Sequence, residues 1–311
     1  MCQSGNPHGV RLYTGKQRKS SMQYYYSIAG LRVNFDIPFP VTIQRESKNF
    51  IFSGQCPEKP DLNFVFRPVD ALPPMPVGGH WEIDQYHVQT PQGRLIYHCP
   101  VRSKPPYALV QWPADRPDTI LCRYLPGGEE YMNFSHNLCD LIGLETLLQF
   151  GGGMILHSSF IRWQGCGILF SAPSGTGKST QAELWARHEK AEILNGDRAG
   201  LRPGARGWTA YGLPYAGSSG IYRNESAPVL ALVVLEQGKS NSLCPLDPVQ
   251  AFRRLYPEVS AHSWDKQFTE NITEKLFRLV TEIPVYMLRC LPDAGAVQLL
   301  KGSLPQMPKG D

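Results

Sequence analysis

One ten-residue segment, residues 171–180, constrains the fold of this chain more than any other feature. It reads Ser-Ala-Pro-Ser-Gly-Thr-Gly-Lys-Ser-Thr. An apolar run typical of a buried strand precedes it at 167–170, and residues 181–188 after it favour a helix. A strand, a glycine-containing loop, a Lys-Ser pair and a helix, in that order, are the context of a phosphate-binding loop. The segment therefore predicts an α/β fold built around such a loop.

The chemistry of the segment explains this prediction. Gly175 and Gly177 allow the backbone to curl so that several N–H groups point at one anion, and the helix dipole adds positive potential. Lys178 can reach the outer phosphates, and Ser179 can offer its hydroxyl to Mg²⁺. We therefore predict a Mg²⁺-bound nucleotide as the cofactor and name it as ATP, although the loop chemistry leaves the choice between ATP and GTP open. The predicted nucleotide-binding residues are Ser174, Gly175, Thr176, Gly177, Lys178, Ser179 and Thr180.

Ala172 is the one departure from the usual motif, where a glycine stands. Alanine adds only a methyl group, so a tight turn remains accessible if φ stays negative. The alternative interpretation is an ordinary glycine-rich turn before a helix.

Composition indicates a globular protein. The chain has 311 residues, 42% of them hydrophobic and 19% charged, which is enough for two domains with substantial cores. The net charge is only +4, and the densest basic stretch, Lys16, Arg18 and Lys19, has no extended basic stripe behind it. We therefore expect no nucleic-acid partner and interpret the stretch as a solvated terminus.

Cysteine usage and hydropathy point to a cytoplasmic protein. The eight cysteines form no C-x-x-C pair, which argues against a zinc site and favours reduced thiols. The N-terminus lacks the apolar core of a secretion signal, and no run of about 18 apolar residues occurs. We expect no membrane partner.

Two regions differ in pattern. Residues 1–150 predict a β-rich, antiparallel N-terminal domain that ends in a helix at 137–150, with the glycines at 151–153 stopping it. Residues 151–311 predict the nucleotide-binding domain. The strands predicted in the first region are 31–37, 64–66, 95–97 and 108–112.

The second region shows the alternation of strands and helices expected of an α/β domain. Residues 154–156 and 167–170 predict a strand pair with a turn at Gln164-Gly165, and 229–235 predicts a central strand. The remaining predicted elements are strands at 192–194 and 285–288, helices at 248–255 and 265–282, and a short helix from Pro292.

Two carboxylates are candidates for the chemistry. Asp197 follows the strand predicted at 192–194, and ligands of open α/β sheets gather at strand ends, so it is the leading base or metal-facing group. The alternative is that Asp197 caps a turn, as Asn-Gly-Asp strings do. Glu236 ends the strongest apolar run. It is the rival candidate for the catalytic carboxylate, and its role would be to activate water.

Three further side chains are weaker candidates. Arg198 adjoins Asp197, and Arg223 lies in a polar segment; either can neutralise charge during transfer, although most arginines are solvated surface groups. His157 follows a predicted strand, and a hairpin would bring it beside the phosphate-binding loop. A structural histidine is the alternative for His157.

Four segments, taken together, resemble one family. Residues 156–159, 165–170, 174–179 and 195–198 follow in order at short spacing. They are similar to the C-terminal kinase domain of HPr kinase/phosphorylase, a family that shares its core with phosphoenolpyruvate carboxykinases. The resemblance covers about half of the chain, from Met154 onward, and implies a P-loop kinase fold for that half.

The resemblance also implies roles for individual residues. Lys178 and the loop backbone would hold phosphates, and Ser179 and Asp197 would face magnesium. Asp197 would be the base that takes the proton of an acceptor hydroxyl, and His157 would lie near the transferring phosphate. The implied function is phosphorylation of a serine or other hydroxyl on a peptide, protein or small molecule by a homo-oligomeric kinase.

Two other functions stay open. The HPr enzymes carry paired acids where this chain has Asn195-Gly196-Asp197, which fits a nucleotide-binding accessory or regulatory protein with little transferase activity. The second open function is a simple ATPase in which Glu236 activates water.

Overall fold

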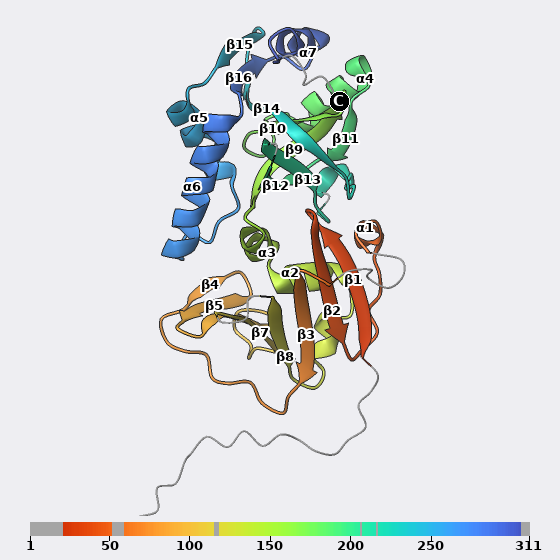
Figure 1. Ribbon diagram of the computed structural model, residues 1–311, viewed down its shortest axis with the longest axis vertical. Helices are drawn as coiled ribbons and strands as arrows, with labels where there is room; N and C mark the ends of the chain where they lie inside the picture. Colours follow the sequence, from red (N-terminus) through yellow and green to blue (C-terminus); the bar gives the residue numbers. More distant parts are fainter. Residues whose placement is uncertain (1–20, 52–58, 115–117, 206, 216, 306–311) are drawn as a thin grey trace, which may run out of the picture.

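The computed structural model describes residues 21–51, 59–114, 118–205, 207–215 and 217–305 of the 311-residue chain. The basic residues Lys16, Arg18 and Lys19 lie outside these ranges. The described chain is a mixed α/β protein with two large sheets, one formed by strands β1–β8 and the other by β9–β16 (Figure 1).

The first sheet has the strand order β1-β2-β3-β8-β7-β6-β5-β4. The strands predicted from sequence in this region are confirmed, but the expectation of an antiparallel sheet is wrong in part. β3 runs parallel to both β2 and β8, because the chain crosses over between these strands instead of turning back in a hairpin. The strands are β1 Met22–Ile28, β2 Leu31–Ile37, β3 Leu62–Pro68, β4 His80–Glu82, β5 Gln85–Thr90, β6 Gly93–His98, β7 Ala108–Pro113 and β8 Thr119–Tyr124, with a short helix α1 at Arg45–Lys48.

The single helix predicted at 137–150 is two helices. α2 covers Ser135–Ile142 and α3 covers Leu144–Phe150. Gly143 divides them with φ of +66°, in the left-handed region that a helix interior does not contain. The two helices lie between the sheets (Figure 1), and their leucines join the core of the first sheet. The predicted stop at the glycines 151–153 is confirmed.

The second sheet has the order β10-β9-β12-β13-β14-β16-β15, with β11 paired to β9. β10 also pairs with β14, so β9, β10, β12, β13 and β14 form a closed ring of pairings. The predicted strand pair is confirmed, with Gln164 and Gly165 both at positive φ in its turn. The strands are β9 Met154–Trp163, β10 Cys166–Ser171, β11 Glu192–Asn195, β12 Arg198–Gly204, β13 Gly207–Gly212, β14 Ser226–Gln237, β15 Ser242–Pro245 and β16 Val285–Cys290.

Helices cover both faces of β10 and β14. α4 (Lys178–Glu189) and α7 (Ala294–Lys301) pack on one face, and α5 (Pro248–Leu255) and α6 (Lys266–Glu282) pack on the other (Figure 1). Successive residues of β10 point to opposite faces, so Phe170 belongs to the α4 core and Leu169 to the α6 core. This two-sided burial explains the continuous apolar runs of β10 and β14.

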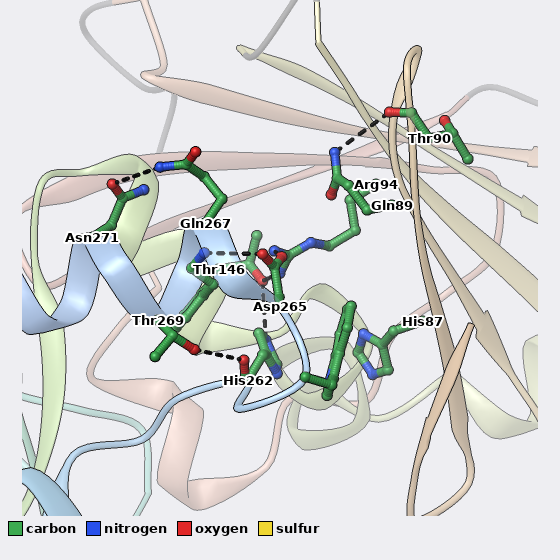
Figure 2. Close-up of polar contacts among 12 residues, drawn as sticks. His87, Gln89, Thr90, Arg94, Thr146, His262, Asp265, Gln267, Thr269 and Asn271 are labelled. Carbon is green, nitrogen blue, oxygen red and sulfur yellow. Dashed lines mark hydrogen bonds and ion pairs between the residues drawn. The ribbon is translucent and has the colours of Figure 1, made fainter. Parts of the chain in front are cut away.

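The two sheets are joined by specific polar contacts. Arg94 of β6 is buried and forms an ion pair with Asp265, the N-cap residue of α6, and donates to Thr146 Oγ1 at 3.1 Å (Figure 2). Elsewhere between the sheets, Arg202 of β12 donates to the backbone oxygen of Ala29 at 2.8 Å. The Arg94 contact with Asp265 ties the start of α6 to the first sheet, and the Arg202 contact ties β12 to the turn between β1 and β2.

Two expectations about composition can be compared with the described residues. The six cysteines within them, Cys99, Cys122, Cys139, Cys166, Cys244 and Cys290, are free thiols. No helix in the described part of the chain has the length and apolar character needed to cross a bilayer.

Candidate active site

The candidate site forms where β9 changes partners. His157 is paired with Arg198 of β12, whereas its neighbour Ser158 is paired with Ser171 of β10. The backbone N–H of Ser158 donates to the backbone oxygen of Asp197 at 2.9 Å. β10 and β12 lie on opposite edges of β9, so pairing with the same stretch of β9 brings the end of β10, His157 and Asp197 together.

The glycine loop, defined as residues 172–177, leaves β10 and leads into α4. Gly175 has φ of +80° and Gly177 has φ of +118°, and a Cβ on either would meet nothing within 4 Å. The positive φ at these two positions therefore favours glycine, whereas contact of an added Cβ with neighbouring atoms does not. Gly177 is the N-cap residue of α4, so the first N–H groups of the helix have no partner inside the helix. Ala172 is buried and does not take a positive φ.

Lys178 lies beneath this loop. Its side chain is buried, and its Nζ donates to the backbone oxygens of Ala172 at 2.7 Å and Pro173 at 3.4 Å. Burial lowers the pKa of Lys178, while the nearby carboxylates of Glu258 and Asp197 oppose that shift. The ammonium group is therefore held at the loop in a partly desolvated position facing two acids.

The other predicted nucleotide-binding residues lie on the loop or the first turn of α4. Ser174, Gly175 and Thr176 line a cleft of about 690 Å³. Ser179 is half-buried, and Thr180 is exposed at the mouth of an adjoining cleft of about 380 Å³. Arg253 and Arg254 of α5 also line the larger cleft, which sequence reasoning did not anticipate.

Asp197 lies in the turn between β11 and β12, and a neighbour shapes that turn. The buried Asn195 side chain accepts hydrogen bonds from the backbone N–H groups of Asp197 at 2.9 Å and Arg198 at 3.0 Å. Its amide group donates to the backbone oxygens of Leu213 and Tyr215. Asn195 thus caps the turn, and the carboxylate of Asp197, 31% exposed, is left to face other side chains.

His157 lies between two carboxylates. Its Nε2 is 3.6 Å from Asp197 Oδ1, and its Nδ1 is 2.8 Å from Glu258 Oε2. Glu258 is at the end of a 3₁₀ turn, Tyr256–Glu258, that follows α5, and its side chain is only 9% exposed. Glu258 was not among the residues predicted from sequence, since no motif surrounds it and only the packing of α5 brings it to β9.

Gly217 closes the other side of Asp197. A Cβ at Gly217 would lie 2.7 Å from both Cβ and Cγ of Asp197, and Gly217 has φ of +52°. Only glycine therefore fits this backbone position without displacing the carboxylate. The polar glycine-serine composition of the segment was its only sequence signal.

The remaining candidates fall in different places. Arg198 Nε is 3.5 Å from Asp197 Oδ2, so Arg198 belongs to the site. The structure does not bring Arg223 to it: Arg223 pairs with Glu192 at 3.3 Å and with Glu225 at 3.8 Å. Glu236 is the next-to-last residue of β14 and lines the glycine-loop cleft, where two arginines neutralise it.

Those two arginines are Arg254, 2.9 Å from Glu236, and Arg289, 2.8 Å from it. The hydrogen bond from Arg289 and the charge of Arg254 lower the pKa of Glu236. A carboxylate with a lowered pKa is a weak base, so the pairing disfavours Glu236 as the group that activates water.

The clefts around these residues are contiguous. Glu258 lines both the glycine-loop cleft and a smaller one of about 190 Å³ that contains His157 and Asp197. The glycine loop and the His157–Asp197–Glu258 group therefore line adjoining clefts, and Lys178 is buried beside the loop. Such an arrangement can hold an anionic group at the loop and accept a proton beside it.

Comparison with protein families adds an identification. The model of the ScmC family, described as SynChlorMet cassette protein ScmC, matches residues 121–295, more than half of the chain. This chain belongs to the ScmC family. The matched region of this ScmC-family chain contains the glycine loop, His157, Asp197 and Glu258.

Among solved structures, the chain is similar to the Hpr(Ser) kinase/phosphatase from Coxiella burnetii, with a TM-score of 0.29 and 10% sequence identity. That similarity covers 48% of this chain and 88% of the other. No curated protein matches this chain.

Proposed function

We propose that this protein is an ATP- and Mg²⁺-dependent phosphotransferase that phosphorylates a hydroxyl group on a peptide, protein or small molecule. The observation that carries the proposal is that two features line adjoining clefts. One is the glycine loop with its buried Lys178, and the other is the Asp197 carboxylate beside His157.

The loop fits the phosphates of a nucleotide. The left-handed conformations of Gly175 and Gly177 leave open space where side chains would otherwise project. The N–H groups at the start of α4 supply donors and positive potential for an anion. Lys178, already directed at the loop oxygens, would exchange these contacts for phosphate oxygens.

The side chains also fit magnesium. Within the described ranges, no group of three or more His, Cys, Asp or Glu residues is placed to enclose a metal. Magnesium in nucleotide sites is held by one or two protein oxygens together with phosphates and water. Ser179 and Asp197 would supply such oxygens here. The ion would neutralise phosphate charge during transfer.

Each residue of the site would have a separate role in phosphoryl transfer. Asp197 would accept the proton of the acceptor hydroxyl as the hydroxyl oxygen bonds to the γ-phosphorus and the bond to the leaving diphosphate breaks. His157 would present Nε2 toward the transferring group and Asp197. Glu258 would orient the imidazole by accepting from Nδ1. Gly217 would hold Asp197 in place.

The test is transfer from γ-labelled ATP in the presence of Mg²⁺, with candidate acceptors that include the products of neighbouring genes. The expected result is a labelled acceptor with wild-type protein and loss of label with Asp197→Asn, while ATP binding persists in the variant. Equal labelling by Asp197→Asn would refute the role of Asp197. Tight ATP binding without a product across all acceptors would favour the accessory or regulatory function.

A further inference from the structure

Asp197 also lines a hollow that does not include the glycine loop. This hollow has a volume of about 590 Å³ and contains Arg198, Tyr215 and Asp140 of α2. The same three residues line a second hollow of about 540 Å³ that reaches β5 and the turn before it. We call these two joined hollows the distal cleft. It begins at the carboxylate proposed as base and runs between the two sheets.

The distal cleft is strongly acidic. Besides Asp197, its lining carries the carboxylates of Glu82, Asp84, Asp140 and Glu145, whereas among the described lining residues Arg198 is the only lysine or arginine. A concave surface with one sign of charge concentrates ligands of the opposite sign.

Some of these carboxylates are already compensated. Arg198 contacts Glu145 at 3.7 Å as well as Asp197, and Glu82 accepts hydrogen bonds from His262 and Trp264. Asp84 accepts one backbone hydrogen bond, from Arg102. Asp140 faces His136 at 3.3 Å and the hydroxyl of Tyr215 at 3.0 Å. Within the described residues, neither Asp84 nor Asp140 forms an ion pair with a lysine or arginine, so the least compensated negative charge lies at these two side chains.

A buried histidine supplies an independent sign of a ligand. His87 is 1% exposed and lines the distal cleft, yet its Nδ1 has no hydrogen-bond partner within the described structure. Its Nε2 lies 3.1 Å from Gln85 Oε1, an oxygen that can only accept, so the proton is on Nε2 and Nδ1 is a free acceptor. Figure 2 shows His87 beside His262, whose ring centroid is 5.3 Å away.

The electrostatics of His87 keep that acceptor available. Burial lowers the pKa of His87 to about 4, and the electrostatic effect of the neighbouring His262 acts in the same direction. The ring is therefore neutral at physiological pH. A buried acceptor without a partner is costly, and a donor group from a ligand would satisfy it.

We propose that the distal cleft is the acceptor site and that it selects acceptors carrying an alkylammonium or guanidinium group near the hydroxyl. The inference deepens the proposed phosphotransferase function and rests on it for the identity of the ligand as an acceptor. The hydroxyl lies at Asp197, and the cation lies toward Asp84 and Asp140. The N–H donors of the cation match both the carboxylates and the free Nδ1 of His87.

Binding of defined probes without nucleotide tests the site itself. Fluorescein-labelled peptides with one serine and one lysine, spaced by zero to three glycines on either side, are compared with matched glutamine and glutamate peptides. A free amino alcohol, 3-amino-1-propanol, is compared with 1,3-propanediol by calorimetry. We expect the best lysine peptide or the amino alcohol to bind at least tenfold more tightly than its neutral counterpart. Selective binding of a peptide would indicate a peptide acceptor, and selective binding of the amino alcohol would indicate a free small-molecule acceptor.

Two isosteric variants tie the preference to the cleft. Asp140→Asn and Asp84→Asn should each reduce the preference for the cationic probe at least threefold, with thermal unfolding midpoints close to wild type. Asp118→Asn, a half-exposed aspartate outside the cleft, is the matched control and should leave the preference unchanged. His87→Gln is a further variant that keeps a polar group but removes the ring acceptor, and it should weaken binding of the same probe.

The outcomes separate this inference from the proposed function. Equal binding of cationic and neutral probes, no binding of any cationic probe, or a preference that survives both aspartate substitutions would overturn the inference. Phosphoryl transfer to neutral acceptors with equal kcat/KM would overturn it while upholding the kinase function. Charge-selective binding that depends on Asp140 and Asp84, without any transfer from ATP, would uphold the cationic site and refute the kinase function.

Discussion

Nδ1 of His157 lies 2.8 Å from Oε2 of Glu258, a residue 101 positions further along the chain. The other ring nitrogen of His157 faces Asp197, so the imidazole is held between the strand-end turn and the segment after α5. A histidine fixed by a carboxylate on one nitrogen presents a defined donor or acceptor on the other. This relationship makes Glu258 a positioning residue for the proposed chemistry.

Replacing Glu258 with glutamine should slow phosphoryl transfer about tenfold, because the imidazole loses its charged partner while the shape is kept. The Kd for ATP should change less than twofold. The pH profile of kcat/KM should shift in the variant, which a merely structural role would not produce. Glu274→Gln, an exposed glutamate of α6, is the control. An unchanged rate and pH profile would remove Glu258 from the account.

Gly217→Ala should displace the Asp197 carboxylate, since the added methyl would lie 2.7 Å from its Cγ. We expect transfer to fall at least tenfold with nucleotide binding retained. Gly220→Ala is a matched control, because Gly220 also has a positive φ, +63°, but a Cβ there meets nothing within 4 Å. Both variants carry a similar backbone cost of about 1–2 kcal/mol. Equal activity of the two variants would contradict the contact with Asp197.

Glu236→Gln should leave basal ATP hydrolysis within about twofold of wild type. Arg254 and Arg289 already neutralise this carboxylate and lower its pKa, which makes it a weak base. Steady-state phosphate release without an acceptor is the measurement. A loss of tenfold or more would instead support the ATPase function.

Acid should destabilise the junction between the sheets through its buried histidines. Burial lowers the pKa of His87 to about 4, below the value of about 6.5 in an unfolded chain. As pH falls below 6.5 the unfolded chain therefore binds the proton first, so stability present above pH 6.5 is lost progressively toward pH 4. At pH 4.5 His87 alone contributes a loss of about 2–3 kcal/mol.

Urea unfolding at pH 7 and pH 4.5 measures this effect. The loss of unfolding free energy between the two values should shrink in His87→Gln and stay at the wild-type size in His188→Gln, where the histidine is exposed. An identical pH dependence in wild type and His87→Gln would show that His87 does not carry the effect.

Local patterns predicted much of the fold, and the failures have physical causes. The apolar runs of β10 and β14 and the turn at Gln164-Gly165 were readable because burial and turn geometry act within a few residues. The pairing partners of the strands could not be read from local patterns, since the parallel contacts of β3 depend on crossover connections between distant segments. The break at Gly143 was missed because the leucines on both sides keep a helical spacing.

The candidate site likewise contains residues that local motifs predict and residues that only long-range contacts place. The glycine loop and Asp197 follow local motifs, and the sequence therefore predicts them, although their roles stay proposals. Glu258, the Asn195 side chain and Gly217 act through contacts with residues far away or through backbone shape, for which the sequence offers little signal. The carboxylates of the distal cleft come from three separate segments, at 82–84, 140–145 and 197, so no single stretch of sequence reveals the cleft.

Isothermal titration calorimetry of Mg²⁺-ATP with wild-type protein and Lys178→Met tests the central claim most directly. Because burial of the Lys178 charge is unfavourable, its removal should leave the unfolding midpoint within a few degrees of wild type. We predict saturable binding to the wild type with a Kd below about 1 mM and at least tenfold weaker binding to the variant. No binding of ATP or GTP to folded wild-type protein at millimolar concentration, or equal binding by both proteins, would contradict the account.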